Sequence, residues 1–300
     1  MRPVAIVNPV AGGGKSRKRW PAIHQLLLDR GLDVEVRVTA GPGDGIRLAR
    51  EAAAAGAPLV IAVGGDGTVN EVGNGLLQAG AGARLGIIPT GTGRDLARCA
   101  GLADARHAVV CLAAGQERPL DAGLATWTNG TERCQRYFFL ECGTGFVTDV
   151  NRSVTAGHRA WKRLGRTLPY VAHTLIKLRG PVNRPFRWSL DGREEEAAAM
   201  ALTVFNGEYF GGGMHAAPGA ALDDGLLDVV GVRAVTRRKL LLLLGLVYRG
   251  KHLGRPEVWR ESARTVRIDG EGAWFDLDGE VMGPTPVEVS VVPGALRLAQ

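Results

Sequence analysis

Cysteine is scarce in this chain of 300 residues, and its four copies show no paired spacing. They form neither a Cys-x-x-Cys pair nor a finger-like pattern, so neither a zinc site nor a disulfide framework is indicated. Reduced thiols in a cytoplasmic compartment are the simpler interpretation. Because no aromatic platform or finger accompanies the basic residues, we expect no nucleic-acid partner.

Long apolar runs are also absent. The longest strongly apolar stretch, residues 240–248, is far below the roughly 18 residues that suggest a membrane span. Residues 1–6 lead directly into an apparent strand, without the layout of a signal peptide. We therefore expect a soluble cytoplasmic protein, and peripheral contact with the inner face of the membrane stays open.

Acidic residues are missing from two basic stretches. The net charge of +7 predicts an anionic partner. Residues 152–187 and 233–255 carry many Lys and Arg side chains and no acid. A helix predicted over 237–255 places leucines among these charges. It either lies transiently on an anionic membrane surface or packs on the protein with solvated ends.

The chain is long enough for two domains or one large one. Four strand and helix alternations fill the first 115 or so residues and predict a mostly parallel, doubly wound α/β sheet, residues 1–121. From residue 122 to residue 300, strand-like segments joined by Asn-Gly and Asp-Gly turns predict an antiparallel β domain. A basic helical stretch, 151–179, is inserted there, with an interruption expected at Pro169.

Residues 59–77 join an apolar strand to a glycine loop and a helix. Gly64, Gly65 and Gly67 allow a sharp turn and a close ligand approach, while Thr68 and Glu71 have the spacing of a capping box. Free amides at a helix N-terminus favour a phosphate. Asp66 would repel that phosphate unless a divalent cation intervenes or the carboxylate handles a proton. The alternative is that Asp66 only shapes the turn.

Two further glycine loops follow predicted strands. Residues 8–16 resemble a Walker A loop but fail it at Pro9, and Lys15 with the loop amides is a candidate phosphate contact. Residues 89–98 contain Gly91-Thr92-Gly93-Arg94. Ligands of such sheets bind at the carboxyl ends of the strands, so we expect these loops to converge there.

Two acidic clusters stand in the second half. Residues 218–228 concentrate carboxylates and carbonyls around a turn, which a hard cation prefers. Residues 276–280, Asp-Leu-Asp-Gly-Glu, read by themselves as a hairpin turn.

In this order, the motifs resemble those of the diacylglycerol kinase catalytic family, which includes bacterial soluble lipid kinases and the sphingosine and ceramide kinases. The motifs are Asn8-Pro9 with its glycine loop, Gly64 to Glu71, Gly91-Thr92-Gly93, Asp224 to Asp228 and Asp278-Gly279-Glu280. The resemblance implies ATP-dependent phosphorylation of a lipid alcohol, in a cleft between a nucleotide domain like that of NAD kinases and a β-sandwich with helical insertions.

The resemblance also implies site residues. Those implied at the ATP phosphates are Asn8, Thr39, Gly64, Gly65, Asp66, Gly67, Thr68 and Thr92. Lys15, Glu71 and Arg94 are further candidates at the phosphates, on the sequence of the loops themselves. Glu280 is the first candidate for the proton acceptor, and Asp66 is the second. Asp66 can instead hold catalytic Mg²⁺. Ala221, Asp224 and Leu226 match a structural Mg²⁺ site. The family commonly has asparagine where this chain has Arg94. The Arg94 side chain contacts a phosphate or headgroup, crowds the nucleotide or faces solvent.

Three classes of function stay open. A lipid kinase, with diacylglycerol favoured over sphingoid bases and ceramide, fits all the motifs. A soluble-substrate kinase of the NAD kinase type and a non-catalytic lipid-binding regulator are the alternatives. A homodimer is also open, because the sequence does not determine the oligomeric state.

Overall fold

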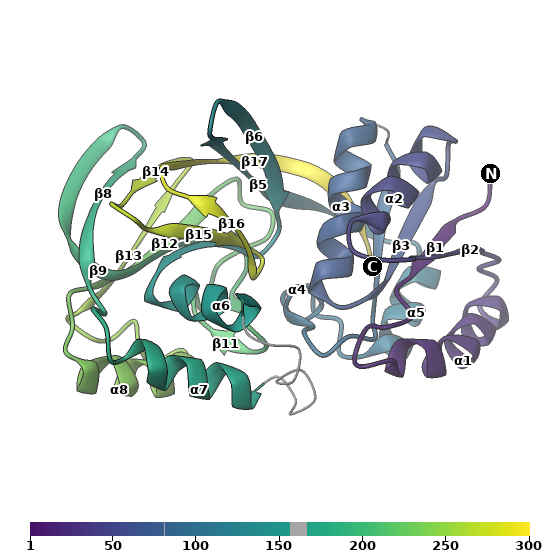
Figure 1. Cartoon of the computed structure of the whole chain (residues 1–300). Helices are drawn as coiled ribbons and strands as arrows, with labels where there is room; N and C mark the ends of the chain where they lie inside the picture. Colours follow the sequence, from purple (N-terminus) through teal and green to yellow (C-terminus); the bar gives the residue numbers. More distant parts are fainter. Residues whose placement is uncertain (81, 157–166) are drawn as a thin grey trace.

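The structure is a computed structural model that describes residues 1–80, 82–156 and 167–300. It has two β-rich bodies side by side, joined by long strands (Figure 1). Among the described residues, no helix is long and apolar enough to cross a membrane.

The N-terminal domain is a parallel sheet with helices on both faces, as predicted. Its strands lie in the order β4-β3-β1-β2, and all four are parallel. Helices α1 and α5 pack together on one face and α2 and α3 on the other (Figure 1). The elements are β1 (Val4–Val7), α1 (Lys15–Asp29), β2 (Glu35–Val38), α2 (Asp44–Ala54), β3 (Leu59–Gly64), α3 (Asp66–Ala79), β4 (Arg84–Pro89), α4 (Asp95–Cys99) and α5 (Ala105–Ala114).

The central strands are apolar because they are covered on both sides. Every residue of β1 and β3 is buried, which is the pattern expected of a parallel sheet between helix layers. Strand β2 is at the edge and alternates between half-buried and exposed residues. The apolar faces of the helices complete this first core.

The second domain is an antiparallel β-sandwich-like body, again as predicted. Strands β8, β9, β12 and β13 pair antiparallel in this order, and β5 and β6 form a hairpin through the Asn129-Gly130 turn. The strands are β5 (Glu117–Asn129), β6 (Glu132–Phe138), β7 (Glu141–Gly145), β8 (Arg184–Leu190), β9 (Arg193–Phe205), β10 (Tyr209–Phe210), β11 (Met214–His215), β12 (Leu227–Arg233), β13 (Val258–Ala263), β14 (Thr265–Asp269), β15 (Trp274–Leu277), β16 (Glu280–Pro284) and β17 (Val287–Ala299).

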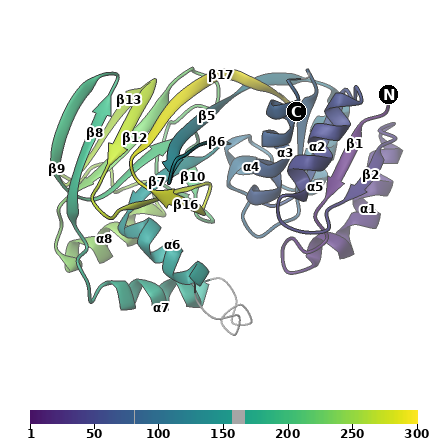
Figure 2. The ribbon, with the colours of Figure 1, turned by 45° about the horizontal axis from the view of Figure 1, so that its top comes forward.

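Three helices cover one side of this domain: α6 (Phe146–Ala156), α7 (Thr167–Lys177) and α8 (Arg237–Val247) (Figure 2). Aromatic residues such as Phe138, Trp188 and Phe275 fill the core between the sheets. A third apolar cluster joins α6 and α8 to the strands through residues such as Phe146 and Leu240.

Of two helix predictions, one stays open and one needs correction. Pro169 is the third residue of α7 as described, near the helix start, where a missing N–H costs little; residues 157–166, between α6 and α7, lie outside the described part of the chain, so the predicted interruption stays a prediction. Helix α8 ends at Val247 instead of continuing to residue 255. The basic residues at 159, 162, 163 and 166 lie outside the described part of the chain.

Strands β5 and β17 run through both domains. They pair antiparallel along most of their length, and the end of β17 also pairs parallel with β4 at Leu298 and Leu85. Leu120, Ala122 and Leu298 all belong to the first core. The boundary predicted between residues 121 and 122 therefore falls inside a shared strand, and the chain end packs with the first domain.

We predict that Leu298→Ala destabilises the protein by about 2–5 kcal/mol, because it leaves a cavity in the first core. Leu298 is fully buried. Urea unfolding measures the free energy of unfolding, and Leu241→Ala on exposed α8 is the matched control, with a change within about 0.5 kcal/mol. Equal effects of the two variants would contradict the shared packing of β17.

Candidate active site

The predicted phosphate loops meet at one edge of the parallel sheet. They follow the carboxyl ends of β1, β3 and β4. Backbone hydrogen bonds bind them together: Asn8 N donates to Val63 O at 3.0 Å, and the amides of Thr90 and Gly91 both donate to Gly64 O, at 2.8 and 2.9 Å. The predicted convergence is confirmed.

Glycine is required where these loops touch. A side-chain carbon on Gly91 would overlap the backbone of Gly65, and one on Gly12 would lie 2.8 Å from Thr90 O. Gly12, Gly13 and Gly14 all have positive φ, at 62°, 69° and 84°, a region that glycine adopts without the strain other residues meet. In the described part of the chain, no group accepts a hydrogen bond from the amides of Gly12 and Gly13. Such free donors at the start of α1 suit an anion.

Asn8 and Thr68 are brought together, but the capping box predicted for Thr68 and Glu71 is wrong. Asn8 Nδ2 donates to Thr68 Oγ1 at 3.0 Å. Helix α3 already begins at Asp66, and its N-cap is Gly65, which makes no side-chain cap. Thr68 thus lies in the first turn of the helix, and its hydroxyl fixes the loop after β1.

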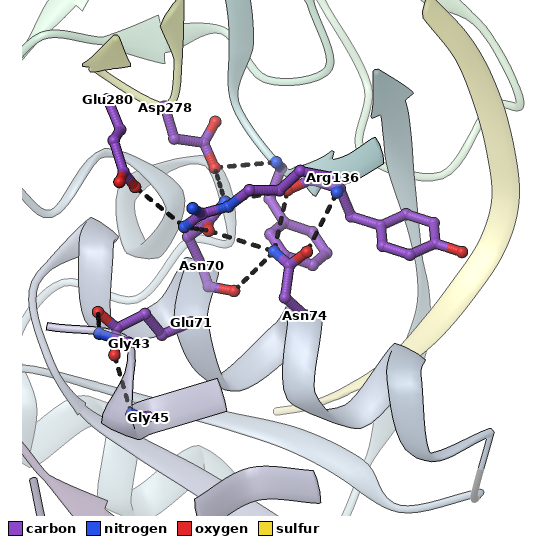
Figure 3. Close-up of polar contacts among 10 residues, drawn as sticks. Gly43, Gly45, Asn70, Glu71, Asn74, Arg136, Asp278 and Glu280 are labelled. Atoms are coloured by element: carbon purple, nitrogen blue, oxygen red, sulfur yellow. Dashed lines mark hydrogen bonds and ion pairs between the residues drawn. The ribbon is translucent and has the colours of Figure 1, made fainter. Parts of the chain in front are cut away.

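Glu71 points away from the glycine loops. Its two carboxylate oxygens accept from the amides of Gly43 and Gly45, each at 2.9 Å (Figure 3). These amides lie at the start of α2, so Glu71 satisfies donors that the helix leaves open. Thr39 directly follows β2, is buried, and donates its amide to Val7 O, at the end of β1, at 3.0 Å.

Lys15, Thr92 and Arg94 are exposed at the rim of the same loops. Lys15 is the first residue of α1, and Arg94 is the N-cap of the short α4. No described residue accepts a hydrogen bond from the Arg94 guanidinium. All three side chains are therefore available to a ligand in front of the cradle.

Asp66 is a carboxylate in a poorly solvated position. Its Oδ1 accepts from Leu96 N at 3.1 Å. Burial, and next the charge of Asp95, raise the pKa of Asp66 to about 6. Asp95 is itself buried between Arg98 Nη1, at 3.0 Å, and Gly212 N, at 2.6 Å. A buried carboxylate whose ionisation is opposed by a like charge is suited to a cation or a proton.

Glu280 is joined to the helix of Asp66 through two polar residues. Glu280 Oε2 pairs with Arg136 Nη2 at 3.0 Å, and the same nitrogen donates to Asn70 Oδ1 at 3.0 Å (Figure 3). Asn70 lies one turn after Asp66 on α3. The turn that carries Glu280 is therefore linked by side-chain contacts to the helix that begins at Asp66, although the two residues are far apart in sequence.

Asp278 anchors the turn that carries Glu280. Asn70 Nδ2 donates to its Oδ2 at 2.7 Å. The amides of residues 139–141 donate to the same carboxylate, at 2.9 to 3.1 Å. Burial raises the pKa of Asp278, and these four donors oppose the shift.

The predicted metal turn is held at the start of the sandwich, where Asp121 N on β5 donates to Leu222 O at 2.7 Å. Asp224 is exposed, and its Oδ1 accepts from Leu226 N at 3.0 Å. The buried Asp121 reaches the same turn, since its Oδ2 accepts from Gly225 N at 2.7 Å. Two carboxylates and the carbonyls of Ala221 and Leu226 are hard oxygen donors of the kind that Mg²⁺ prefers.

The sequence alone did not single out several of these residues. Asp95 and Asp278 stood inside quoted motifs without an assigned role, and Asp121 looked like one residue of a strand. Asn70 also stood inside the motif Gly64 to Glu71 without an assigned role. Arg136 gave no local signal, because its importance comes from contacts with Asn70, 66 positions away, and with Glu280.

Comparison with known proteins agrees with this geometry. Residues 2–125 match the diacylglycerol kinase catalytic domain, and residues 142–300 match the YegS C-terminal NAD kinase beta sandwich-like domain. The chain belongs to the diacylglycerol kinase family. It is 36% identical over 299 residues to a Mycobacterium tuberculosis diacylglycerol kinase, covering 98% of this chain and 93% of that protein. A Citrobacter koseri protein named probable lipid kinase YegS-like is 33% identical, covering 91% of this chain and 88% of that one.

Solved structures of a diacylglycerol kinase and of an NAD kinase share the fold of this chain. A diacylglycerol kinase from Bacillus anthracis has a TM-score of 0.72 at 23% identity, covering 99% of this chain and 96% of that one. An NAD kinase from Archaeoglobus fulgidus, solved in complex with ATP, has a TM-score of 0.54 at 14% identity, covering 100% and 94%.

We predict that Gly91→Ala weakens ATP binding by at least about tenfold, because the added methyl group pushes the loops after β3 and β4 apart. Titration with a fluorescent ATP analogue measures the dissociation constant. Gly245→Ala on α8, where a side-chain carbon meets nothing within 4 Å, is the control. Unchanged binding in Gly91→Ala would show that the contact of these loops does not form the nucleotide site.

Proposed function

We propose that this protein is an ATP-dependent lipid kinase that transfers the γ-phosphate to a lipid hydroxyl, with a diacylglycerol as the preferred acceptor. The observation that supports the proposal is that α3, which begins at Asp66 beside the glycine loops, is linked to the Glu280 carboxylate through Asn70 and Arg136. Phosphoryl transfer needs positioning and charge neutralisation more than covalent chemistry. This site offers both.

The two sides of the site divide the work. The free amides of Gly12 and Gly13, the N-terminal ends of α1 and α3, and the rim residue Lys15 face the triphosphate. From the other domain, Glu280 presents an exposed carboxylate held by an arginine. A carboxylate within reach of the lipid hydroxyl accepts its proton as the oxygen attacks phosphorus.

Asp66 also suits a catalytic Mg²⁺, because Leu96 N holds its Oδ1 and so fixes the carboxylate beside the glycine loops. A bound Mg²⁺ would neutralise charge that develops on the phosphates. On the chain's own side, Asp95 and Leu96 fix the orientation of the Asp66 carboxylate. Asp224, with Asp121 behind its turn, would hold a second, structural Mg²⁺.

The two alternatives lack such support. A soluble-substrate kinase is favoured only by the likeness to an NAD kinase at 14% identity, which concerns the fold. A non-catalytic lipid-binding protein has no need for a carboxylate within a phosphate cradle and a second one linked to the same helix. Retention of both Asp66 and Glu280 therefore favours catalysis.

The decisive experiment incubates the protein with ATP, Mg²⁺ and a total lipid extract and identifies new phosphorylated lipids by mass spectrometry. We predict a phosphorylated acylglycerol.

Asp66→Asn keeps the acceptor for Leu96 N but removes the charge, and we expect it to lower the rate by about 10²- to 10⁴-fold. Glu280→Gln should lower the turnover rate while ATP binding stays within about twofold of the wild type.

A parallel reaction with NAD in place of lipid tests the soluble-substrate alternative. Phosphorylated NAD without phosphorylated lipid would replace the proposal, and neither product would favour the regulator. Circular dichroism and thermal unfolding check that each variant folds. Full activity in Asp66→Asn would contradict the assignment of the site.

The acceptor of such a kinase lies in a bilayer, and we infer that the protein docks on an anionic membrane through α7 and α8. Arg237 on α8 donates to Gly180 O, just after α7, at 3.2 Å. The surface shared by the two helices exposes about half of each of Val171, Leu175, Ile176, Leu241 and Leu242. We call it the α7–α8 surface.

The charges around this surface favour an anionic bilayer as the occupant. Arg179, Arg237, Arg238, Arg249 and Lys251 are exposed beside the apolar side chains, and Lys239 pairs with Glu257. Apolar side chains ringed by basic ones combine burial in the headgroup region with attraction to anionic lipids. Helix α7 is also close to the site, since Tyr170 OH donates to Asn151 Oδ1 at 2.9 Å, and Asn151 holds the Glu280 turn.

We predict that Arg238→Glu combined with Arg249→Glu reduces binding to vesicles that contain phosphatidylglycerol by at least about tenfold at low salt, since each basic residue contributes about 1 kcal/mol. Co-sedimentation measures the partition. The matched control reverses Arg106 and Arg133, exposed residues of α5 and β6. Equal partition of the two double variants would overturn the docking surface.

A further inference from the structure

The hairpin that carries Glu280 rests on buried carboxyl groups that the proposed reaction does not use. Strands β15 and β16 are joined by Asp278 and Gly279, both with positive φ, at 47° and 82°. Gly279 N donates to Glu141 Oε1 at 3.1 Å, and Gly279 O accepts from Asn151 Nδ2 at 2.8 Å. Glu141 is 1% exposed. Glu141 on β7 thus holds the amide of Gly279, and Asn151 on α6 holds its carbonyl.

The other oxygen of Glu141 faces a second buried carboxylate. A side-chain carbon on Gly143 would lie 2.8 Å from Glu141 Oε2 and 3.2 Å from Asp276 Oδ1, so both oxygens adjoin the same point. Asp276 accepts from Thr148 Oγ1 and, at 3.3 Å, from Asn151 Nδ2. No donor among the described residues serves Glu141 Oε2, and no described Lys or Arg pairs with either carboxylate.

Two facing carboxylates without a cation cannot both be ionised at modest cost. The proton belongs on Glu141, because Asp276 has two side-chain donors and Glu141 has one backbone amide. Burial raises the pKa of Glu141 well above its ordinary range, and the charges of Asp276 and Asp278 add to the shift. Burial raises the pKa of Asp276 to about 6.

We propose that Glu141 is a positioning residue for phosphoryl transfer and that it acts as a neutral carboxyl group, donating to Asp276 and accepting from Gly279 N. This arrangement fixes the turn one residue before Glu280. The inference rests on the proposed function, in which Glu280 receives the proton of the lipid hydroxyl. Glu141 touches neither substrate nor reacting atoms, and it acts only through the turn.

Ionisation of Glu141 would place an unpaired charge beside Asp276 on β15 and Asp278 in the turn. The Cys142 thiol on its own strand faces the same groups, and burial and these carboxylates raise the pKa of that thiol as well. All of these groups lose protons as the pH rises. The folded pKa of Glu141 lies above its unfolded value of about 4. The folded protein therefore loses stability relative to the unfolded chain as the pH rises from about 4 through the folded pKa of Glu141.

We predict that Glu141→Gln keeps the wild-type turnover rate within about twofold at pH 7, because an amide donates and accepts as the neutral acid does. Its turnover and its melting temperature should fall less than those of the wild type towards alkaline pH. Glu141→Ala should lower the turnover rate by at least about tenfold through displacement of the turn, with ATP binding unchanged. Glu132→Gln, an exposed change on β6, is the control.

Full turnover in Glu141→Ala, or a loss in Glu141→Gln as large as in Glu141→Ala, would overturn the proposal. A second readout does not depend on the lipid reaction. Infrared spectra at pH 7 should contain a protonated-carboxyl band that Glu141→Gln lacks, and identical spectra would refute the neutral state. If the wild type phosphorylates no lipid but shows this band, the proposed function fails while the state of Glu141 is confirmed.

Discussion

The Asp278 carboxylate is the contact on which the active-site geometry depends. One buried side chain receives three successive amides at the junction of β6 and β7 and the amide of Asn70 from α3. It therefore joins the nucleotide domain to the sandwich at the residue that precedes the Gly279-Glu280 pair. A carboxylate can accept this many hydrogen bonds because each oxygen has two lone pairs, whereas a hydroxyl or amide at this position would leave buried amides unpaired.

Small residues make this approach of the domains close enough. A side-chain carbon on Gly73 of α3 would lie 2.5 Å from the Phe139 ring. Glycine at this position therefore lets the junction of β6 and β7 pack directly on the helix. Asn74 donates to Tyr137 O at 2.9 Å and accepts from Tyr137 N at 3.1 Å. One face of α3 thus carries the phosphate loop at its N-terminus and the interdomain contacts along its length.

The shared strands give the same site a rigid frame. Because β5 and β17 pass through both cores, the domains are joined by main-chain pairing as well as by the Asp278 contacts. Asp95, held by Gly212 N, adds a third contact between the domains close to Asp66. Such multiple links favour a fixed position of Glu280 relative to the phosphate cradle, and they explain why buried carboxyl groups are kept there despite their desolvation cost.

The sequence by itself determined the two kinds of sheet and the three glycine loops, because apolar periodicity, glycine positions and hairpin turns act over a few residues. Local patterns also suggested a capping box at Thr68, which failed because α3 begins two residues earlier, at Asp66. Only the tertiary structure decided that Glu71 serves α2, that Asp278 joins the domains, that β17 returns to the first core and that Glu141 faces Asp276. These outcomes depend on contacts between residues more than a hundred positions apart, or between neighbouring helices. Burial and charge there act through space, which sequence spacing does not encode.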